Sequence, residues 1–125
     1  MKHSAEYYIE HLEMEPHVEG GYFKECLLEK EERNLWSSIY FMLAKGEVSH
    51  FHRLKSDEVW YYHDGHALTI YMIDEAGKLT AAKLGLDLEK GEVPQVLVPK
   101  GMIFGSAMEE EGFSLVGCMV SPCFK

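Results

Sequence analysis

A series of short runs rich in β-branched and aromatic residues, separated by turn signals, constrains the fold of this chain most strongly. Turns are marked by glycine-containing pairs such as Gly20-Gly21, Asp64-Gly65 and Lys100-Gly101. The connections are too short for helical crossovers between parallel strands, so the sequence predicts an all-β sandwich or barrel. About nine strands are expected, at Tyr22–Leu28, Trp36–Leu43, Val48–Leu54, Glu58–His63, Leu68–Ile73, Leu79–Leu84, Gln95–Val98, Ile103–Met108 and Phe113–Val120.

The first residues lack this pattern and instead predict a short amphipathic helix. Ser4 is a suitable N-cap, and apolar side chains recur at helical spacing after it. We expect the helix over Ala5–Met14, ended by Pro16, because the residue before a proline disfavours the helical conformation.

Length and charge limit the domain organisation and the kinds of partner. At 125 residues the chain is long enough for one hydrophobic core. We expect a single domain over residues 1–125, with the helical segment at 1–15 and a barrel at 20–122. The 21 acidic residues outnumber the 12 basic ones and give a net charge of -9, with no basic stripe. This charge argues against nucleic acid and against an anionic membrane surface as partners.

The cysteines and the N-terminus indicate the cellular location. Cys26, Cys118 and Cys123 are an odd number and form no metal-binding C-x-x-C pair. We interpret them as reduced thiols, with Cys118 buried in an apolar strand and Cys123 more accessible. No apolar run approaches the length of a membrane span, and the N-terminus does not read as a signal peptide. A cytoplasmic location is therefore expected.

The stretch His50-Phe51-His52, followed by Glu58, carries the strongest chemical signal in the chain. Side chains alternate along a strand, so His50 and His52 are expected on one face, within reach of Glu58 from the next strand. Two imidazoles and a carboxylate suit one divalent transition metal, such as Zn, Fe, Mn or Ni. Two alternatives stay open: a polar pocket that binds an organic ligand, and a His–Glu pair that is satisfied internally.

Without a metal, the same residues predict acid–base chemistry. The unperturbed pKa of a histidine side chain lies near working pH, so His52 could act as a general acid or base, oriented by Glu58. Tyr62 lies on the same face of its strand as Glu58 and Trp60, and could serve as a proton donor. The alternative is that Trp60 and Tyr62 only form the wall of the pocket.

These stretches resemble the two sequence motifs of the cupin superfamily. The segment from Gly46 to Gly65, which includes the histidine pair and Glu58, resembles the first motif, and Gly91–Phe104 resembles the second. The chain is most similar to a small single-domain cupin subfamily of largely unknown function, over roughly His11 to Pro122. The matching stretches are Pro16–Glu25, Ser56–Trp60, Gly91–Pro99 and Leu115–Cys118.

The resemblance implies a double-stranded β-helix, or jelly-roll barrel, that is usually dimeric, with a pocket similar to that of nucleotide-sugar epimerases. The chain departs from the superfamily pattern in places. Five residues separate His52 from Glu58, where the general motif has three or four, and Phe104 stands where metal cupins have a third histidine. Tyr61 stands where many members of the subfamily are expected to have histidine.

Further pocket residues are expected around the paired glycines, which allow positive φ or a close backbone approach. A strand that starts there would deliver Tyr22 and Lys24 to the pocket beside Glu19, and Lys24 could meet an anionic group. Gln95 could face the lumen as an amide donor. The alternatives are an ordinary turn at the glycines and an exposed strand end at Gln95.

The leading interpretation is a small-molecule-binding cupin, an isomerase or epimerase of sugar-like or nucleotide-linked substrates. Its pocket would be lined by Glu19, Tyr22, Lys24, Trp60, Gln95 and Phe104, with His52 and Tyr62 catalytic. One alternative is a metal-dependent oxygenase or isomerase that uses His50, His52 and Glu58 as ligands. Another is a non-catalytic ligand sensor. The expected partners are a small molecule and a second copy of the chain in a homodimer.

Overall fold

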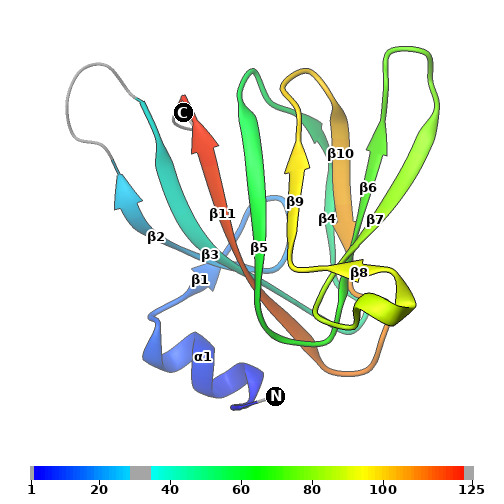
Figure 1. The fold of residues 1–125 in the computed structure, drawn as a ribbon. Helices are drawn as coiled ribbons and strands as arrows, with labels where there is room; N and C mark the ends of the chain where they lie inside the picture. The colour runs from blue at the N-terminus through cyan, green and yellow to red at the C-terminus, as the bar shows by residue number, and fades with distance from the viewer. Residues whose placement is uncertain (1, 29–34, 123–125) are drawn as a thin grey trace.

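Two β-sheets face each other in the computed structural model of the protein (Figure 1). The structure describes residues 2–28 and 35–122, and the side chains of these residues except 26–28. The side chains of Cys26 and Cys123 therefore lie outside the described part. The elements are α1 (Ala5–His11), β1 (Glu15–Pro16), β2 (Tyr22–Leu28), β3 (Ser37–Ala44), β4 (Val48–Arg53), β5 (Asp57–Gly65), β6 (Leu68–Ile73), β7 (Leu79–Leu84), the 3₁₀ turn η1 (Leu88–Lys90), β8 (Glu92–Val93), β9 (Gln95–Val98), β10 (Ile103–Ala107) and β11 (Phe113–Ser121).

The strand order is that of a jelly-roll sandwich. The six-stranded sheet has the order β1-β2-β3-β11-β5-β9, and the five-stranded sheet has the order β4-β10-β6-β7-β8. Apart from the parallel contact of β7 with β8, neighbouring strands in the described chain are antiparallel. The chain passes repeatedly from one sheet to the other, as expected of this architecture. The prediction of an all-β fold with one N-terminal helix is confirmed.

The nine predicted strands are all present, with ends that move by at most two residues. Two further strands, β1 and β8, were not predicted. Each has two residues, which is too short to show the alternation of apolar and polar side chains from which strands are recognised.

The helix α1 is shorter than predicted. Ser4 caps it as expected, because its hydroxyl accepts a hydrogen bond from a backbone N–H of the first turn at 3.1 Å. The helix ends at His11 instead of Met14, and Glu13 then takes a left-handed φ of 54°. Pro16 lies beyond the helix and pairs with β2 as part of β1. Within the described ranges, no helix is long and apolar enough to cross a membrane.

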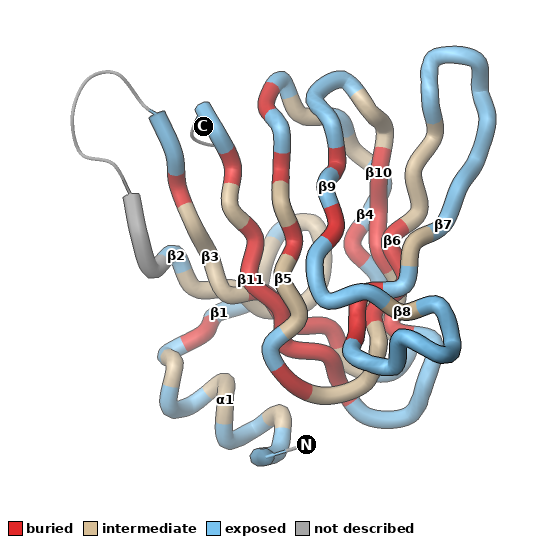
Figure 2. Tube along the Cα trace, in the orientation of Figure 1, coloured by how far each residue is buried: buried red, intermediate tan, exposed pale blue. Residues whose placement is uncertain are grey.

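Apolar side chains fill the space between the two sheets, where Figure 2 shows buried positions on facing strands. Full burial of one such side chain stabilises a fold by about 1.5–3 kcal/mol, so this cluster holds the sheets together. A smaller cluster lies between α1 and the outer face of the six-stranded sheet. The main cluster includes Phe41, Leu43, Trp60, Leu68, Ile70, Leu84, Val98, Phe104 and Val116, and the smaller one includes Met14, Met42, Phe113 and Leu115.

A buried carboxylate attaches the N-terminus to the six-stranded sheet. The Tyr8 hydroxyl donates a hydrogen bond to Asp64 Oδ2 at 2.7 Å, and the Lys2 backbone N–H donates to the same atom at 2.9 Å. Burial by itself would raise the pKa of Asp64, but hydrogen bonds from Tyr8 and from backbone N–H groups outweigh it and lower the pKa to about 2. The carboxylate is therefore charged at neutral pH and holds α1 in place.

We predict that Tyr8→Phe lowers the free energy of unfolding by about 1 kcal/mol near pH 7, because it removes a hydrogen bond to a carboxylate. The pKa of Asp64 is lower in the folded chain than the ordinary value of about 3.9. The contribution of the Asp64 carboxylate to the free energy of unfolding is therefore present above about pH 4 and is lost as the pH falls towards 2. Urea unfolding near pH 7 and near pH 2.5 measures the change, and Tyr7→Phe on the same helix is the control. Equal effects of the two substitutions would contradict the assignment.

A β-bulge in β4 changes the alternation of its side chains. In the ladder with β10, Phe104 pairs with His52 and Ser106 pairs with Ser49, so two residues of β4 lie opposite Gly105. The backbones approach closely there, because a Cβ atom on Gly105 would lie 2.8 Å from the Ser49 carbonyl oxygen. The bulge therefore depends on a glycine at position 105.

We predict that Gly105→Ala destabilises the fold by about 1–3 kcal/mol, because the added methyl group must push the β4 backbone away. Chemical denaturation measures the loss. Wild-type stability in this variant would show that the two strands separate without cost.

Candidate functional site

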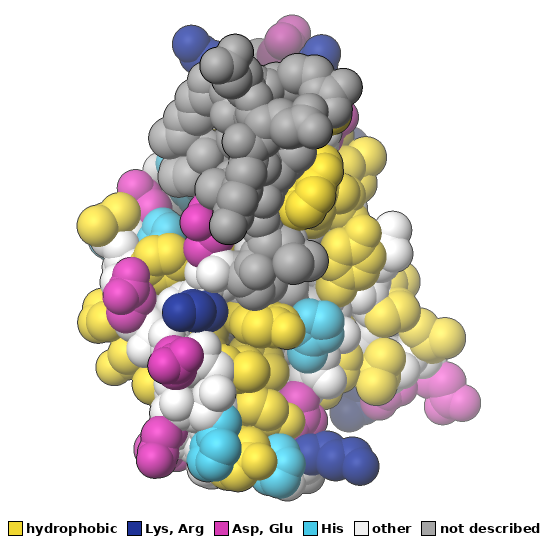
Figure 3. Space-filling model, turned by 90° about the vertical axis from the view of Figure 1, so that its left-hand side faces the viewer, with side chains coloured by type: hydrophobic (Ala, Val, Ile, Leu, Met, Phe, Trp, Pro, Cys, Tyr) yellow, Lys and Arg dark blue, Asp and Glu magenta, His cyan; other side chains and the backbone are white. Residues whose placement is uncertain are grey.

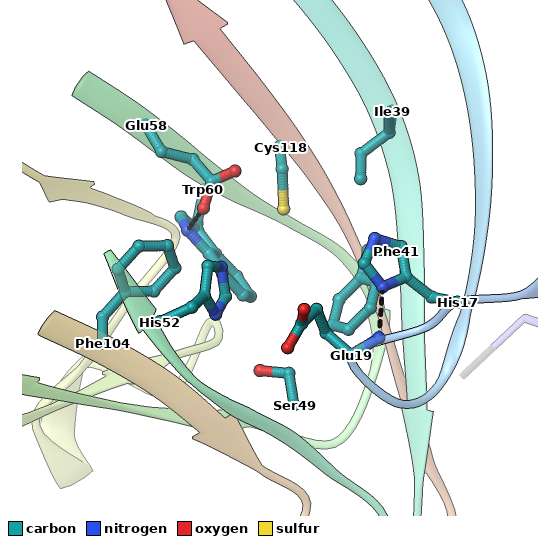
Figure 4. A pocket seen from close by; sticks show the side chains of 10 residues that line it. All are labelled: His17, Glu19, Ile39, Phe41, Ser49, His52, Glu58, Trp60, Phe104 and Cys118. Carbon is teal, nitrogen blue, oxygen red and sulfur yellow. Dashed lines mark hydrogen bonds between the residues drawn. The ribbon is translucent and has the colours of Figure 1, made fainter. Parts of the chain in front are cut away.

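A cavity of about 420 Å³ lies between the two sheets and is lined by β1, β2, β3, β4, β5, β11 and the segment after β1. A narrower space of about 40 Å³ extends it towards β10. Figure 4 shows the side chains around the narrower part. The residues that line both parts are His17, Glu19, Ile39, His52, Glu58 and Cys118, so the two spaces form one site.

The bulge in β4 decides which histidine faces this site. Ser49 and His52 both line the cavity, whereas the His50 side chain is exposed. The expectation that His50 and His52 share one face is wrong, because the extra residue in the bulge reverses the alternation between them. Ser49 forms a hydrogen bond with β10, because its Oγ lies 2.6 Å from Ser106 Oγ.

His52 presents a basic nitrogen when its ring is neutral. Its Nδ1 lies 2.7 Å from the His50 carbonyl oxygen. Because a carbonyl only accepts hydrogen bonds, Nδ1 carries the proton, and Nε2 keeps the lone pair. The ring packs against Phe104 with centroids 4.4 Å apart. The position that supplies a third histidine in metal cupins therefore holds an aromatic ring that contacts His52.

Glu58 is a buried carboxyl group with a raised pKa. Its side chain comes from β5, and the residue is 8% exposed. The Trp60 indole donates a hydrogen bond to Glu58 Oε1 at 2.7 Å. Burial raises the pKa of Glu58 to about 7, and the hydrogen bond from Trp60 only partly opposes this rise. Glu58 can therefore give or take a proton near neutral pH.

The paired glycines bring His17 and Glu19 to the site. The Glu19 backbone N–H donates to His17 Nδ1 at 2.9 Å, as Figure 4 shows. Gly20 has a φ of 108°, and a Cβ atom there would lie 1.9 Å from the Val48 carbonyl oxygen. Only glycine allows the segment to lie this close to β4. Burial lowers the pKa of His17, while Glu19 opposes that shift.

The strand after the glycines delivers other side chains than expected. Phe23 and Glu25 line the cavity. Tyr22 packs in the cluster under α1, and Lys24 has the same parity in the strand as Tyr22, so neither lines the cavity. The sequence shows that side chains of this strand alternate between two faces. Both faces carry apolar side chains, so the sequence does not indicate which one points into the cavity.

Among the other expected pocket residues, Glu19, Trp60 and Phe104 line the cavity. Gln95 is exposed on the edge strand β9. The Tyr62 hydroxyl donates to the Gly65 carbonyl oxygen, and its ring packs against the main core cluster. Neither Gln95 nor Tyr62 is among the described residues that line the cavity.

The expected metal ligands do not fit one ion. His50 points away from the cavity that holds His52 and Glu58. In the described part of the chain, no three His, Cys, Asp or Glu side chains are arranged to hold a metal. Cys118 lines the cavity, but burial and then the nearby Glu58 raise the pKa of its thiol, which favours the protonated form over a metal-binding thiolate.

Solved structures share this fold. A crystal structure of a protein from Shewanella oneidensis is 60% identical, with a TM-score of 0.94, and the match covers 98% of this chain and 80% of that one. A hypothetical protein from Leishmania major is 35% identical, with a TM-score of 0.91 and coverage of 98% and 84%. Oxalate decarboxylase from Bacillus subtilis is 20% identical over 90% of this chain and 28% of its own, with a TM-score of 0.68, and shows the fold alone. A search of curated proteins finds no significant match.

The family comparison agrees with the fold and with the sequence motifs. The model described as "Cupin superfamily (DUF985)" matches residues 6–125, which is nearly the whole chain. The resemblance stated from the sequence motifs is thereby confirmed. The chain belongs to the DUF985 family of the cupin superfamily.

Proposed function

We propose that the protein binds a small carbonyl compound in the cavity and moves protons on it, as an isomerase or epimerase. The observation that carries this proposal is the pair formed by His52 and Glu58. Both line the same cavity, one with a basic nitrogen and the other with a carboxyl group of pKa about 7. Proton transfer requires a base and an acid in the same cavity, and the Glu58 carboxyl group titrates near working pH.

Each residue then has a distinct role. Nε2 of neutral His52 removes a proton from the carbon next to the substrate carbonyl. Protonated Glu58 donates a hydrogen bond to the carbonyl oxygen and stabilises the enolate that forms. For epimerisation, the enolate turns over in the cavity and the protonated His52 returns the proton to the other face of the same carbon. For isomerisation, His52 returns the proton to the former carbonyl carbon, and Glu58 gives its own proton to the former carbonyl oxygen. The Glu58 carboxylate then takes up the proton of the neighbouring hydroxyl group, whose oxygen becomes the new carbonyl oxygen. No net charge is created, and both residues end in their starting states.

The cavity wall favours this chemistry. Phe41, Trp60, Phe104 and Ile39 surround the polar groups with apolar surface. Such surface excludes water and strengthens electrostatic interactions with the substrate. A volume of about 420 Å³ is within the range of small-molecule sites.

The lining does not favour a nucleotide-linked substrate. No Lys or Arg side chain of residues 2–28 or 35–122 lines the cavity, and Lys24 does not reach it. Phosphate groups are usually bound by such cations. We therefore propose a substrate without phosphate groups, such as a simple sugar-like compound.

No step is assigned to a metal. Mn(II) centres are a property of the Bacillus subtilis oxalate decarboxylase. Here the bulge in β4 places His50 outside the cavity that holds the other two expected ligands, His52 and Glu58.

The homodimer expected from the sequence stays a prediction. Sedimentation equilibrium measures the mass of the protein in solution and checks it.

We predict that Glu58→Gln and His52→Gln each slow proton transfer by about 10²–10⁴-fold, because each removes one of the two proton-transfer groups. The wild type and the variants are incubated with a panel of aldoses and ketoses in D₂O. NMR then follows deuterium incorporation beside the carbonyl. His50→Gln is the matched control, because His50 is exposed outside the cavity.

Two outcomes would overturn this assignment. Equal exchange in the wild type and both variants would remove His52 and Glu58 from the reaction. Binding of panel members without exchange in the wild type would make the protein a non-catalytic ligand sensor.

The proposal also sets the pH dependence. Because Glu58 acts as its protonated form, kcat/KM should fall as the pH rises above about 7. A pH–rate profile of the exchange reaction measures this, and the fall should be missing from the residual activity of Glu58→Gln. A rate that rises through pH 7 and 8 would contradict the role of Glu58 as the acid.

A further inference from the structure

Several of the described residues that line the cavity carry carboxylates. They come from three separate positions in the fold, Glu15 on β1, Glu19 after it and Glu25 on β2. Glu58 lines the same cavity but acts in its protonated form, so it adds no charge. The described lining residues include no Lys or Arg. Figure 3 shows acidic side chains among hydrophobic, histidine and basic side chains on the face that carries β2. With a net charge of -9 for the whole chain, this cavity attracts cations.

The Glu19 backbone is fixed by hydrogen bonds, and its carboxylate acts on the neighbouring His17 through its charge. Its backbone N–H donates to His17, and its carbonyl oxygen accepts from the His50 backbone N–H at 2.9 Å. Among the residues that the structure describes, none donates a hydrogen bond or forms an ion pair with the Glu19 carboxylate. The residue is half-buried, so part of the hydration of its charge is lost.

Glu58 offers a second polar contact to a molecule in the same cavity. Glu58 is 8% exposed, and Trp60 bonds only its Oε1 atom. No described residue donates to Oε2, although the side chain lines the cavity. Because the side chain lines the cavity, Oε2 can form a hydrogen bond with a molecule bound there.

The aromatic wall suits the same kind of ligand. Phe23 and Phe41 line the cavity on the side of the His17 ring, which contacts both rings edge-on. Aromatic faces attract cations, by about 0.5–2 kcal/mol depending on desolvation. They also pack against the carbon skeleton of a small molecule.

We propose that the ligand carries a protonated amine that pairs with the Glu19 carboxylate, with its carbon skeleton against the aromatic wall. This inference rests on the proposed function and names the substrate class: small amine-bearing carbonyl compounds, such as amino sugars. Glu15 and Glu25 are exposed at the cavity and increase the local concentration of such cations.

Three probes of equal size and different charge test the inference: benzylammonium, benzyl alcohol and benzoate. Calorimetry near neutral pH should show that benzylammonium binds at least about tenfold more tightly than benzoate. Glu19→Gln should remove most of this difference. Glu75→Gln, in an exposed turn outside the cavity, is the matched control and should preserve it. Thermal unfolding checks that both variants fold.

The outcomes separate this inference from the proposed function. Binding of benzoate or benzyl alcohol as tight as that of benzylammonium would overturn the amine class and leave the small-molecule site intact. An unchanged preference in Glu19→Gln would overturn the pairing with Glu19. If none of the probes binds at millimolar concentrations, both the amine class and the small-molecule site fail.

Discussion

The close approach of β4 to β10 at Gly105 is the constraint on which the site depends. Two residues of β4, His50 and Phe51, share the space opposite this glycine. The resulting bulge turns Ser49 and His52 into the cavity and leaves His50 outside. A single extra residue in one strand therefore separates a pair of histidines that a regular strand would place on one face.

The packing that holds the two sheets together also sets the chemistry of the cavity. Glu58 lies among side chains of the main core cluster and has a single described hydrogen-bond donor, the Trp60 indole. Removing a carboxylate from water disfavours its charged form, which is why its pKa lies near 7. The aromatic ring of Phe104 contributes to this environment and contacts His52. The packing of the core and the raised pKa of Glu58 thus have the same physical cause, the removal of side chains from water.

The fold could be predicted because its signals are local. Alternating apolar residues and glycine-containing turns identify each strand without knowledge of its partners. The predicted helix extends too far because Pro16 is the only stop signal read from the sequence, whereas Glu13 leaves the helical conformation in the structure. The short strand β1 forms only because β2 is there to pair with Glu15 and Pro16.

The sequence by itself determined the family, the strands and the residue types that meet between them, because motif spacing and turn residues are local properties of the chain. Tertiary structure decided which side chains enter the cavity. Phe23 lines the cavity whereas Tyr22 does not, and His50 is exposed outside it. The physical reason is that side chains of a strand alternate with a period of two, so one bulge or one choice of inward face reverses every residue that follows.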